Sequence, residues 1–318
     1  MSAPRFRPPM LATLVDEAVD GDEWIFERKL DGIRLIVVGD GDSVRLLTRN
    51  EHDHTSRYPE LHDALRSQRA ERFVLDGEVV AFDGRTTSFA RLQGRSGITD
   101  PDQARASGIA VYLYLFDVLH LDGDDHDDVP QRQRKALLRD AFDFDDPLRF
   151  STHRNTHGSR YLQQACAAGW EGLIAKRADA VYRSGRSRHW LKLKCVGRQE
   201  LVIGGFTRPK GSRKRLGALL VGYHRDDELI YAGRVGTGFD DATLDRLGDA
   251  LEEREQPEPP FTDAPDDSTA RWVHPDLVCE VGFTEWTRAG RLRHPRFLGL
   301  REDKAAGDVR RETPAPAP

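Results

Sequence analysis

A lysine flanked by two carboxylates is the residue most able to do chemistry in this sequence. Lys29 lies two residues after Glu27 and two residues before Asp31, and Gly32 and Arg34 follow. A lysine amine can attack an electrophile once it has lost its proton, and nearby cations ease that loss. Gly32 permits a close backbone approach or a positive φ at a turn. We therefore take Lys29 as a candidate nucleophile.

The choice of lysine over arginine supports this interpretation. The chain has 40 arginines and only eight lysines. An arginine stays protonated in a protein, whereas the amine of a lysine can be tuned and can attack. Where arginine is the default cation, a lysine indicates a need for an amine or a compact charge. Besides Lys29, four lysines fall in the motifs described below: Lys176, Lys192, Lys194 and Lys304.

Strands and turns must position these residues. Apolar and alternating runs predict a strand, a turn at 29–32 and a second strand over residues 24–38. Further strands are predicted at 43–49, 73–82, 111–119, 169–177 and 190–195. Helices are predicted at 58–70, 131–142 and 158–168, the second with Ala136, Leu137 and Phe142 on its apolar side. Residues 1–20 are expected to be irregular, ending in a short polar helix.

The pattern changes at residues 196–197. Short strands split by glycines and charged turns are predicted at 200–206, 218–224, 229–235, 277–283 and near 285. One helix is predicted between them, at 241–254. Several short strands with one inserted helix suit a small five-stranded barrel such as an OB-fold.

Composition limits where the protein works. No stretch of about 18 apolar residues exists, and the first residues lack the apolar core of a signal peptide. Cys166, Cys195 and Cys279 are far apart and odd in number, so neither a disulfide framework nor a zinc site is expected. The net charge is −5, yet residues 208–215 hold five positive charges, which predicts contact with a phosphate backbone. We expect a cytoplasmic, nucleoid-associated protein.

Five motifs occur in a fixed order, followed by a sixth near the carboxyl end. They are 29–34 (KLDGIR), 75–78 (LDGE), 115–117 (LFD), 171–176 (EGLIAK), 190–194 (WLKLK) and 291–304. Together they resemble the nucleotidyltransferase superfamily of ATP-dependent DNA ligases, RNA ligases and mRNA-capping enzymes. The last motif resembles that of bacterial end-joining DNA ligases, and the resemblance covers nearly the whole chain.

The resemblance implies an α+β fold in two domains. A nucleotidyltransferase domain, an ATP-grasp-like adenylation domain of antiparallel sheets and helices, would span residues 1–196. A small OB-fold β-barrel would follow at 197–304, and the Ala- and Pro-rich residues 305–318 would form a disordered tail. Closure of the second domain over the first predicts a hinge at 196–198.

The resemblance also implies ATP-dependent sealing of DNA nicks or ends. Lys29 would attack the α-phosphate of ATP, release pyrophosphate and form a lysyl-AMP. The AMP would pass to the 5′-phosphate of a nick, and the 3′-hydroxyl would then displace it. Negative charge gathers around phosphorus in each step, so positioning and electrostatic stabilisation should dominate catalysis. The expected setting is DNA repair by non-homologous end joining.

The motifs imply contacts with the nucleoside. Glu27 would bind the amino group or the neighbouring polar edge of adenine. Phe116 would stack on one face of the base, with Ile174 on the opposite face. Arg34 and Glu78 would hold the ribose hydroxyls.

Other matched residues imply phosphate contacts. Lys192 and Lys194 point to one face of their strand and would contact the α-phosphate. Arg186 matches the arginine that precedes this strand in the family. Arg49 would hold the 5′-phosphate side of the nick. Glu51 departs from the pattern, because the family often has a glycine at this position.

Three carboxylates could hold a metal ion. Asp31, Glu78 and Glu171 offer the oxygen ligands that Mg²⁺ prefers, and Mn²⁺ is an alternative. Glu171 is the strongest candidate among them. In the last motif, Arg301 and Lys304 would orient the departing pyrophosphate.

The expected partner is nicked or broken double-stranded DNA, bound by a monomer without a membrane. Ku and an end-joining polymerase are candidate protein partners. Two alternatives stand beside a DNA ligase. One is an RNA ligase or a GTP-using capping guanylyltransferase. The other is a non-catalytic nucleic-acid-binding module.

Overall fold

The chain folds into two compact units. The computed structural model describes residues 3–312 except 16, 196, 210–214 and 284. Contacts within the chain divide it into a first unit, Met1–Cys195, and a second unit, Val196–Thr313. No helix in these described ranges is long and apolar enough to cross a membrane.

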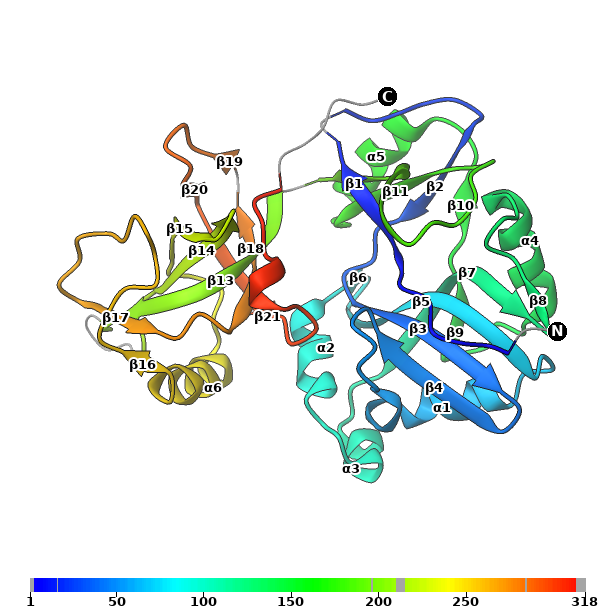
Figure 1. Ribbon diagram of the computed structural model, residues 1–318, viewed down its shortest axis with the longest axis horizontal. Coiled ribbons are helices and arrows are strands. Elements are labelled where there is room, and N and C mark those ends of the chain that lie inside the picture. The colour runs from blue at the N-terminus through cyan, green and yellow to red at the C-terminus, as the bar shows by residue number, and fades with distance from the viewer. Residues whose placement is uncertain (1–2, 16, 196, 210–214, 284, 313–318) are drawn as a thin grey trace. The chain divides into compact units, whose positions relative to one another are not determined.

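The first unit contains a five-stranded sheet with the order β1-β12-β11-β2-β10 (Figure 1). Its strands are β1 (Met10–Leu14), β2 (Trp24–Arg28), β10 (His153–Arg154), β11 (Gly172–Arg177) and β12 (Gly185–Lys194). Side chains alternate between the faces of a strand. On one face the apolar residues pack against helix α5 (Gly158–Ala167): Trp24, Phe26, Leu173, Ala175, Leu191 and Leu193. The other face is left for the polar residues of the motifs.

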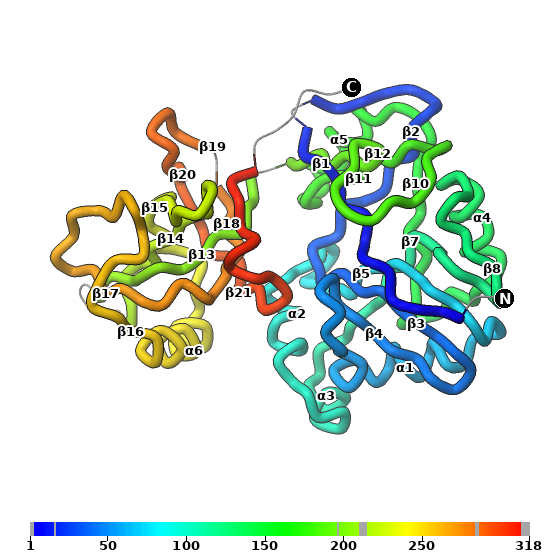
Figure 2. The backbone as a smooth tube through the Cα atoms, viewed as in Figure 1, coloured from blue at the N-terminus to red at the C-terminus, as the bar shows by residue number. Residues whose placement is uncertain are grey.

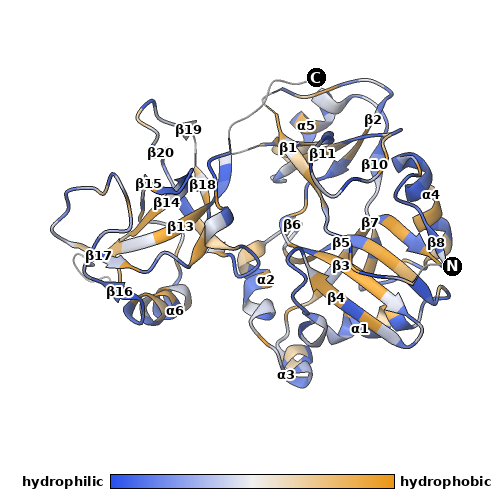
Figure 3. Ribbon diagram, viewed as in Figure 1, coloured by the Kyte–Doolittle hydropathy of each residue, from blue (hydrophilic) through white to orange (hydrophobic). Residues whose placement is uncertain are grey.

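A second sheet of the first unit has the order β4-β3-β5-β7-β8, with β6 on β5 and β9 on β7. Its strands are β3 (Ile33–Asp40), β4 (Ser43–Thr48), β5 (Arg72–Asp83), β6 (Thr86–Thr87), β7 (Val111–Leu121), β8 (Asp124–Asp125) and β9 (Leu148–Phe150). One face packs on apolar residues of α1 (Pro59–Arg66), α2 (Phe89–Ser96) and α4 (Gln131–Ala141). A short helix, α3 (Pro101–Ala106), and the turn η1 (Thr55–Arg57) complete this layer. Figure 3 shows the apolar bands that run along β3, β5 and β7.

The two sheets share a small core. Ile36, Val74 and Phe116 from the second sheet cluster with Met10 and Trp190 from the first. The motif-bearing face of the five-stranded sheet therefore lies against the inner face of the second sheet. This contact decides which side chains can meet.

The second unit is built around β13 (Gly197–Thr207). This strand pairs with β14 (Leu219–Arg225) on one side and with β17 (Ala270–Val273) and β18 (Val278–Phe283) on the other. The register shifts between Ile203 and Gly205, and such a bulge bends a strand. The remaining elements are β15 (Glu228–Val235), α6 (Asp241–Glu252), β16 (Glu255–Gln256), β19 (Glu285–Trp286), β20 (Leu292–Arg293), β21 (Arg296–Leu300) and η2 (Ala306–Asp308). Strongly bent strands around one core agree with the predicted OB-fold.

Two predictions about the chain ends were wrong. The predicted irregular lead-in contains β1, which pairs in parallel with β12. Figure 2 shows this blue N-terminal segment beside the green strands of the sheet. The five residues of β1 carry too little pattern to reveal a partner so distant in the sequence. In the predicted disordered tail, Val309 is buried and its carbonyl accepts from the N–H of His224 at 2.8 Å. Residues 313–318 lie outside the described residues, as does Val196 of the predicted hinge.

The expectation of no disulfide was also wrong. Cys166 at the end of α5 and Cys195 after β12 form a disulfide, with 5.2 Å between their Cα atoms. Cys279 is a buried free thiol. Spacing along the chain could not show that α5 returns beside the end of β12.

Candidate active site

Strand alternation brings the motif residues to one face of the five-stranded sheet. Ile174 on β11 lies between Glu27 on β2 and Lys192 on β12 in the register. Two residues farther along, Lys176 lies opposite Trp190. Residues at these alternate positions point away from α5, toward the second sheet.

Lys29 follows the end of β2. Its backbone N–H donates to the carbonyl of Gly172 at 2.9 Å, and its Nζ lies 2.6 Å from Glu171 Oε1. The Lys29 side chain is 21% exposed, whereas that of Glu171 is 3% exposed. Gly32 is required nearby, since a Cβ there would lie 2.1 Å from the Val79 carbonyl oxygen. This confirms the close backbone approach predicted for Gly32.

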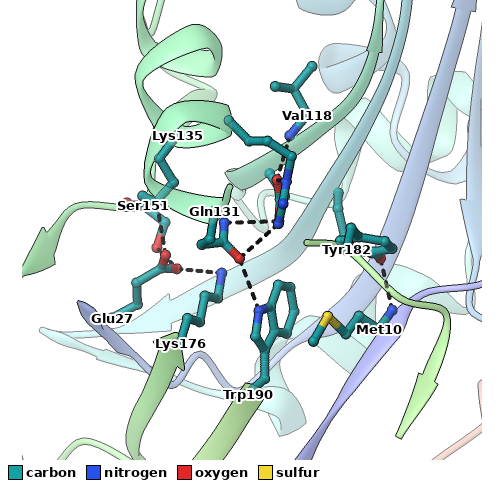
Figure 4. A network of polar contacts seen from close by, with 12 residues as sticks. Met10, Glu27, Val118, Gln131, Lys135, Ser151, Lys176, Tyr182 and Trp190 are labelled. Atoms are coloured by element: carbon teal, nitrogen blue, oxygen red, sulfur yellow. Dashed lines mark hydrogen bonds and ion pairs between the residues drawn. The ribbon is translucent and has the colours of Figure 1, made fainter. Parts of the chain in front are cut away.

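Glu27 sits in a buried ionic cluster (Figure 4). Its Oε1 lies 2.9 Å from Lys135 Nζ, and its Oε2 lies 3.1 Å from Lys176 Nζ. Ser151 Oγ donates to Oε2 at 3.0 Å. None of the three charged side chains is more than 3% exposed. Two cations on one buried carboxylate fix both its position and its charge.

Burial and charge act against each other here. Burial works to raise the pKa of Glu27, but the charges of Lys135 and Lys176 outweigh burial and hold that pKa below its usual value. Burial lowers the pKa of Lys176 to about 8, although Glu27 opposes the change. The carboxylate is therefore ionised at neutral pH, and Lys176 is close to losing its proton.

A second ion pair, between a partly exposed arginine and a buried carboxylate, supports the aromatic residue of the site. Arg34 makes two hydrogen bonds to Asp76, whose side chain also accepts from Tyr182 Oη at 2.7 Å. The Arg34 guanidinium lies 4.6 Å from the centre of the Phe116 ring, and Lys176 Nζ lies 4.3 Å from it. Phe116 occupies a bulge, because Asp76 pairs with Asp117 while Gly77 pairs with Leu115. Such bulges commonly redirect a side chain.

The other predicted nucleotide contacts lie on the same strands. Glu78 is the cross-strand partner of Arg34, and its Oε1 accepts from the N–H of Gly32 at 2.9 Å. Lys194 is paired with Gly172 and lies two residues after Lys192, on the same face of β12. Arg186 lies apart from these, exposed at the start of β12, where it donates to the carbonyl of Ala12 at 2.9 Å.

Arg49 lies in the turn after β4. The turn is closed by Thr48, whose N–H donates to the carbonyl of His52 at 2.9 Å and whose carbonyl accepts from Glu51. Glu51 has φ +62°, the left-handed conformation that glycine adopts readily. The turn thus keeps a glycine-like backbone at a cost of about 1–2 kcal/mol.

The three candidate metal ligands are not gathered into a cluster. Asp31 and Glu171 are both buried, and the N–H of Asp31 donates to Thr87 Oγ1 at 3.3 Å. Among the described residues, no group of three or more His, Cys, Asp or Glu is placed to hold a metal ion. The donors are nevertheless of the kind that Mg²⁺ prefers. Asp31 lies in the same motif as Lys29, and Glu171 pairs with Lys29.

The last motif lies in the second unit. Arg301 donates twice to Asp303, at 2.9 Å each, and once to Glu280 at 3.0 Å. Lys304 Nζ lies 3.4 Å from Glu200 Oε1. Most of the predicted basic stretch 208–215 lies outside the described residues, and Arg215 is paired with acids of α6.

Sequence reasoning missed the contribution of α4. The buried side chains of this helix are Gln131, Arg134, Lys135 and Leu138. Arg134 is paired with Asp117, and Gln131 bridges Asp117 and Trp190. The predicted apolar side was only partly right, since Phe142 is buried but Ala136 is not. The helical spacing of residues 131, 134, 135 and 138 could have indicated this face, but three of these four residues are polar, so a search for apolar residues did not find it.

Comparisons with known proteins identify the family to which the chain is similar. A family described as ATP dependent DNA ligase domain matches residues 9–194, and one described as ATP dependent DNA ligase C terminal region matches residues 212–304. The multifunctional non-homologous end joining protein LigD of Pseudomonas aeruginosa is 42% identical over 99% of this chain and 38% of its own length. The LigD DNA repair protein of Mycobacterium tuberculosis is 37% identical over 96% of this chain and 40% of its own.

One solved structure is similar over its full length. It is described as mycobacterial DNA ligase D complexed with ATP and MES, is 35% identical, and covers 96% of this chain and 98% of that one with a TM-score of 0.70. This chain spans only about two fifths of the curated relatives that it matches. The family matches favour a DNA ligase over the RNA ligase, capping and non-catalytic alternatives.

Proposed function

Because the chain belongs to the family of ATP-dependent DNA ligases, we propose that Lys29 is the nucleophile that attacks the α-phosphate of ATP. The observation that carries this proposal is the Lys29–Glu171 pair at the end of β2. The amine is partly accessible, while its carboxylate partner is buried. Attack on a phosphate requires an amine that the substrate can reach, and the partial exposure of Lys29 meets this condition.

We assign the nucleoside to the space between the two sheets of the first unit. Glu27 binds the polar edge of adenine, and Phe116 and Ile174 cover its faces. Arg34 and Glu78, which are cross-strand partners, hold the ribose. The contact between Arg34 and the Phe116 ring supports this assignment, because it fixes the aromatic face that the base would meet.

The phosphate contacts come from several elements. Lys192 and Lys194 contact the α-phosphate, and Arg49 and Arg186 contact the DNA. Asp31, Glu78 and Glu171 would offer oxygen ligands to Mg²⁺ from separate positions rather than as one cluster, and the ion would neutralise charge on the phosphates. Arg301 and Lys304 act on the pyrophosphate from an OB domain at 197–304, which follows an adenylation domain at 1–196.

The substrate is a nick or break in double-stranded DNA, and the setting is end-joining repair. The similarity to the two LigD proteins supports this setting. Ku and an end-joining polymerase are the corresponding partner candidates.

Mass spectrometry after exposure to ATP and Mg²⁺ tests the proposal. One AMP is expected on the wild-type chain, attached to Lys29, and none on Lys29→Ala. A nicked DNA duplex should then be sealed by the adenylated protein. An adduct on another residue, or sealing by Lys29→Ala, would contradict the assignment.

A further inference from the structure

Lys135 lies outside every matched motif, yet it reaches into the site. It comes from α4, whereas Glu27 comes from β2. Its side chain is 1% exposed. Its Nζ forms an ion pair with Glu27 Oε1 at 2.9 Å and donates a hydrogen bond to the carbonyl of Ser151 at 2.7 Å. The ammonium also lies 4.5 Å from the centre of the Phe150 ring. The carboxylate, the carbonyl and the ring together fix the position of the Lys135 ammonium.

Resting on the proposed function of Glu27, we propose that Lys135 is a positioning residue that makes the site choose adenine over guanine. Its ammonium holds Oε1 and keeps the carboxylate ionised, so that Glu27 meets the base as an acceptor. An ionised carboxylate accepts from the amino group of adenine but has no proton to donate to the O6 of guanine. A protonated carboxyl could make that bond.

The charge on Glu27 depends on few groups. Lys135 faces it from α4, Lys176 from β11, His153 from β10 and, farther away, Tyr161 from α5. Burial lowers the pKa of His153 and raises that of Tyr161, so both stay neutral between about pH 7 and pH 8. Lys176 remains largely charged below its pKa of about 8. Without Lys135, the carboxyl of Glu27 loses one of its two cations, and its pKa moves up toward neutral pH.

Removing Lys135 should raise the pKa of Glu27, since burial would then be opposed by one cation instead of two. In Lys135→Met, selectivity for ATP over GTP should fall as the pH is lowered and recover as it is raised. Each unit by which the pKa of Glu27 rises above the working pH changes the ionised fraction about tenfold. The wild-type selectivity should stay flat over the same range.

The test measures lysyl-AMP and lysyl-GMP formation by the full chain between about pH 7 and pH 8, where His153 stays neutral. Lys135→Arg should restore the flat profile, because it keeps the charge. The matched control is Arg139→Met on the same helix; Arg139 lines the same cavity of about 520 Å³ as Lys135 but pairs with Asp140. That variant should behave like the wild type.

A double variant guards against misfolding. The double variant Glu27→Gln/Lys135→Met removes the buried charges of both residues, and it is compared with Glu27→Gln alone. The two should have the same ATP-to-GTP ratio, because Lys135 acts through Glu27. A lower ratio in the double variant would overturn the proposal.

Two further results separate this inference from the proposed function. If Lys135→Met lowers both rates equally at every pH, Lys135 has only a structural role and the inference fails. If the wild type forms no lysyl-AMP, the proposed function itself fails.

Discussion

Two lysine–carboxylate arrangements lie on the same sheet and differ in how much water they meet. Around Glu27, two lysines hold one carboxylate and every side chain is at most 3% exposed. Lys29 pairs with Glu171, and the lysine side chain is 21% exposed. Glu27 and Lys29, the central residues of the two arrangements, are only two residues apart in the sequence.

The difference shows how one strand can serve recognition and chemistry. Buried charges are costly unless all of them stay paired, so the Glu27 cluster tolerates little movement. A rigid acceptor of known charge suits base recognition. Lys29 pairs with Glu171 and is partly exposed, which suits an amine that must leave its partner and attack.

The largest expected effect is on chemistry at Lys29. Lys29→Arg keeps a cation for Glu171 but removes the amine that forms the adduct, so no lysyl-AMP should form. The free energy of unfolding should change by less than about 0.5 kcal/mol, because the position is partly exposed. Mass spectrometry and thermal unfolding check the two statements. If the Lys29→Arg protein were still adenylated, Lys29 would not be the nucleophile, and the two clusters would not divide chemistry from recognition.

The carboxylate of the accessible cluster should have the next largest effect. Glu171→Gln should reduce the rate of adenylation by about two to three orders of magnitude, as loss of one electrostatic contact does in other enzymes. Asp179→Asn is the control, since Asp179 is exposed and pairs with Arg177 just after β11. Single-turnover measurements with labelled ATP compare them. Equal rates for both variants would show that Glu171 is only structural.

Part of the site could be predicted from the sequence. The apolar pattern of residues 24–38 placed Lys29 at a turn after a strand, and in the structure the alternation of β11 and β12 places Ile174, Lys176 and Lys192 on one face. Gly32 was expected to allow a close approach, which the Val79 carbonyl oxygen confirms. These features depend on neighbours in the sequence or on regular periodicity.

The features that could not be predicted depend on long-range packing. The buried face of α4 is polar, so a search for apolar spacing selected Ala136 and Leu137 instead of Arg134 and Lys135. Lys135 was, however, one of only eight lysines in the chain, and that rarity could have marked it. The Cys166–Cys195 disulfide likewise joins segments whose proximity is set by the whole sheet.

The buried cluster should also be visible in the pH dependence of stability. The pKa of Lys176 is lowered to about 8, so between about pH 8 and pH 10.5 the unfolded chain binds more protons at this residue than the folded chain. Stability should therefore rise with pH in this window, by about 3 kcal/mol from this residue. Lys176→Met should lack the rise. Denaturant unfolding across the window measures it.

A matched control separates burial from the loss of any lysine. Lys304→Met removes a lysine that is 23% exposed and lies 3.4 Å from Glu200. It should keep the wild-type rise with pH, because Lys176 is intact. If Lys176→Met and Lys304→Met show the same profile, the buried cluster does not govern the titration.

The smallest expected effect comes from the hydroxyl that completes the buried cluster. Ser151→Ala removes the hydrogen bond to Glu27 Oε2 and should lower the free energy of unfolding by about 1.5 kcal/mol. Ser159→Ala is its exposed counterpart, because Ser159 also donates to a carboxylate, that of Asp20. It should cost less than about 0.5 kcal/mol, since water can replace the lost donor. Denaturant unfolding at one pH compares the two. If Ser151→Ala and Ser159→Ala lower the free energy of unfolding equally, burial does not strengthen the hydrogen bond to Glu27. The Glu27 cluster and the Lys29–Glu171 pair would then differ only in their exposure to water.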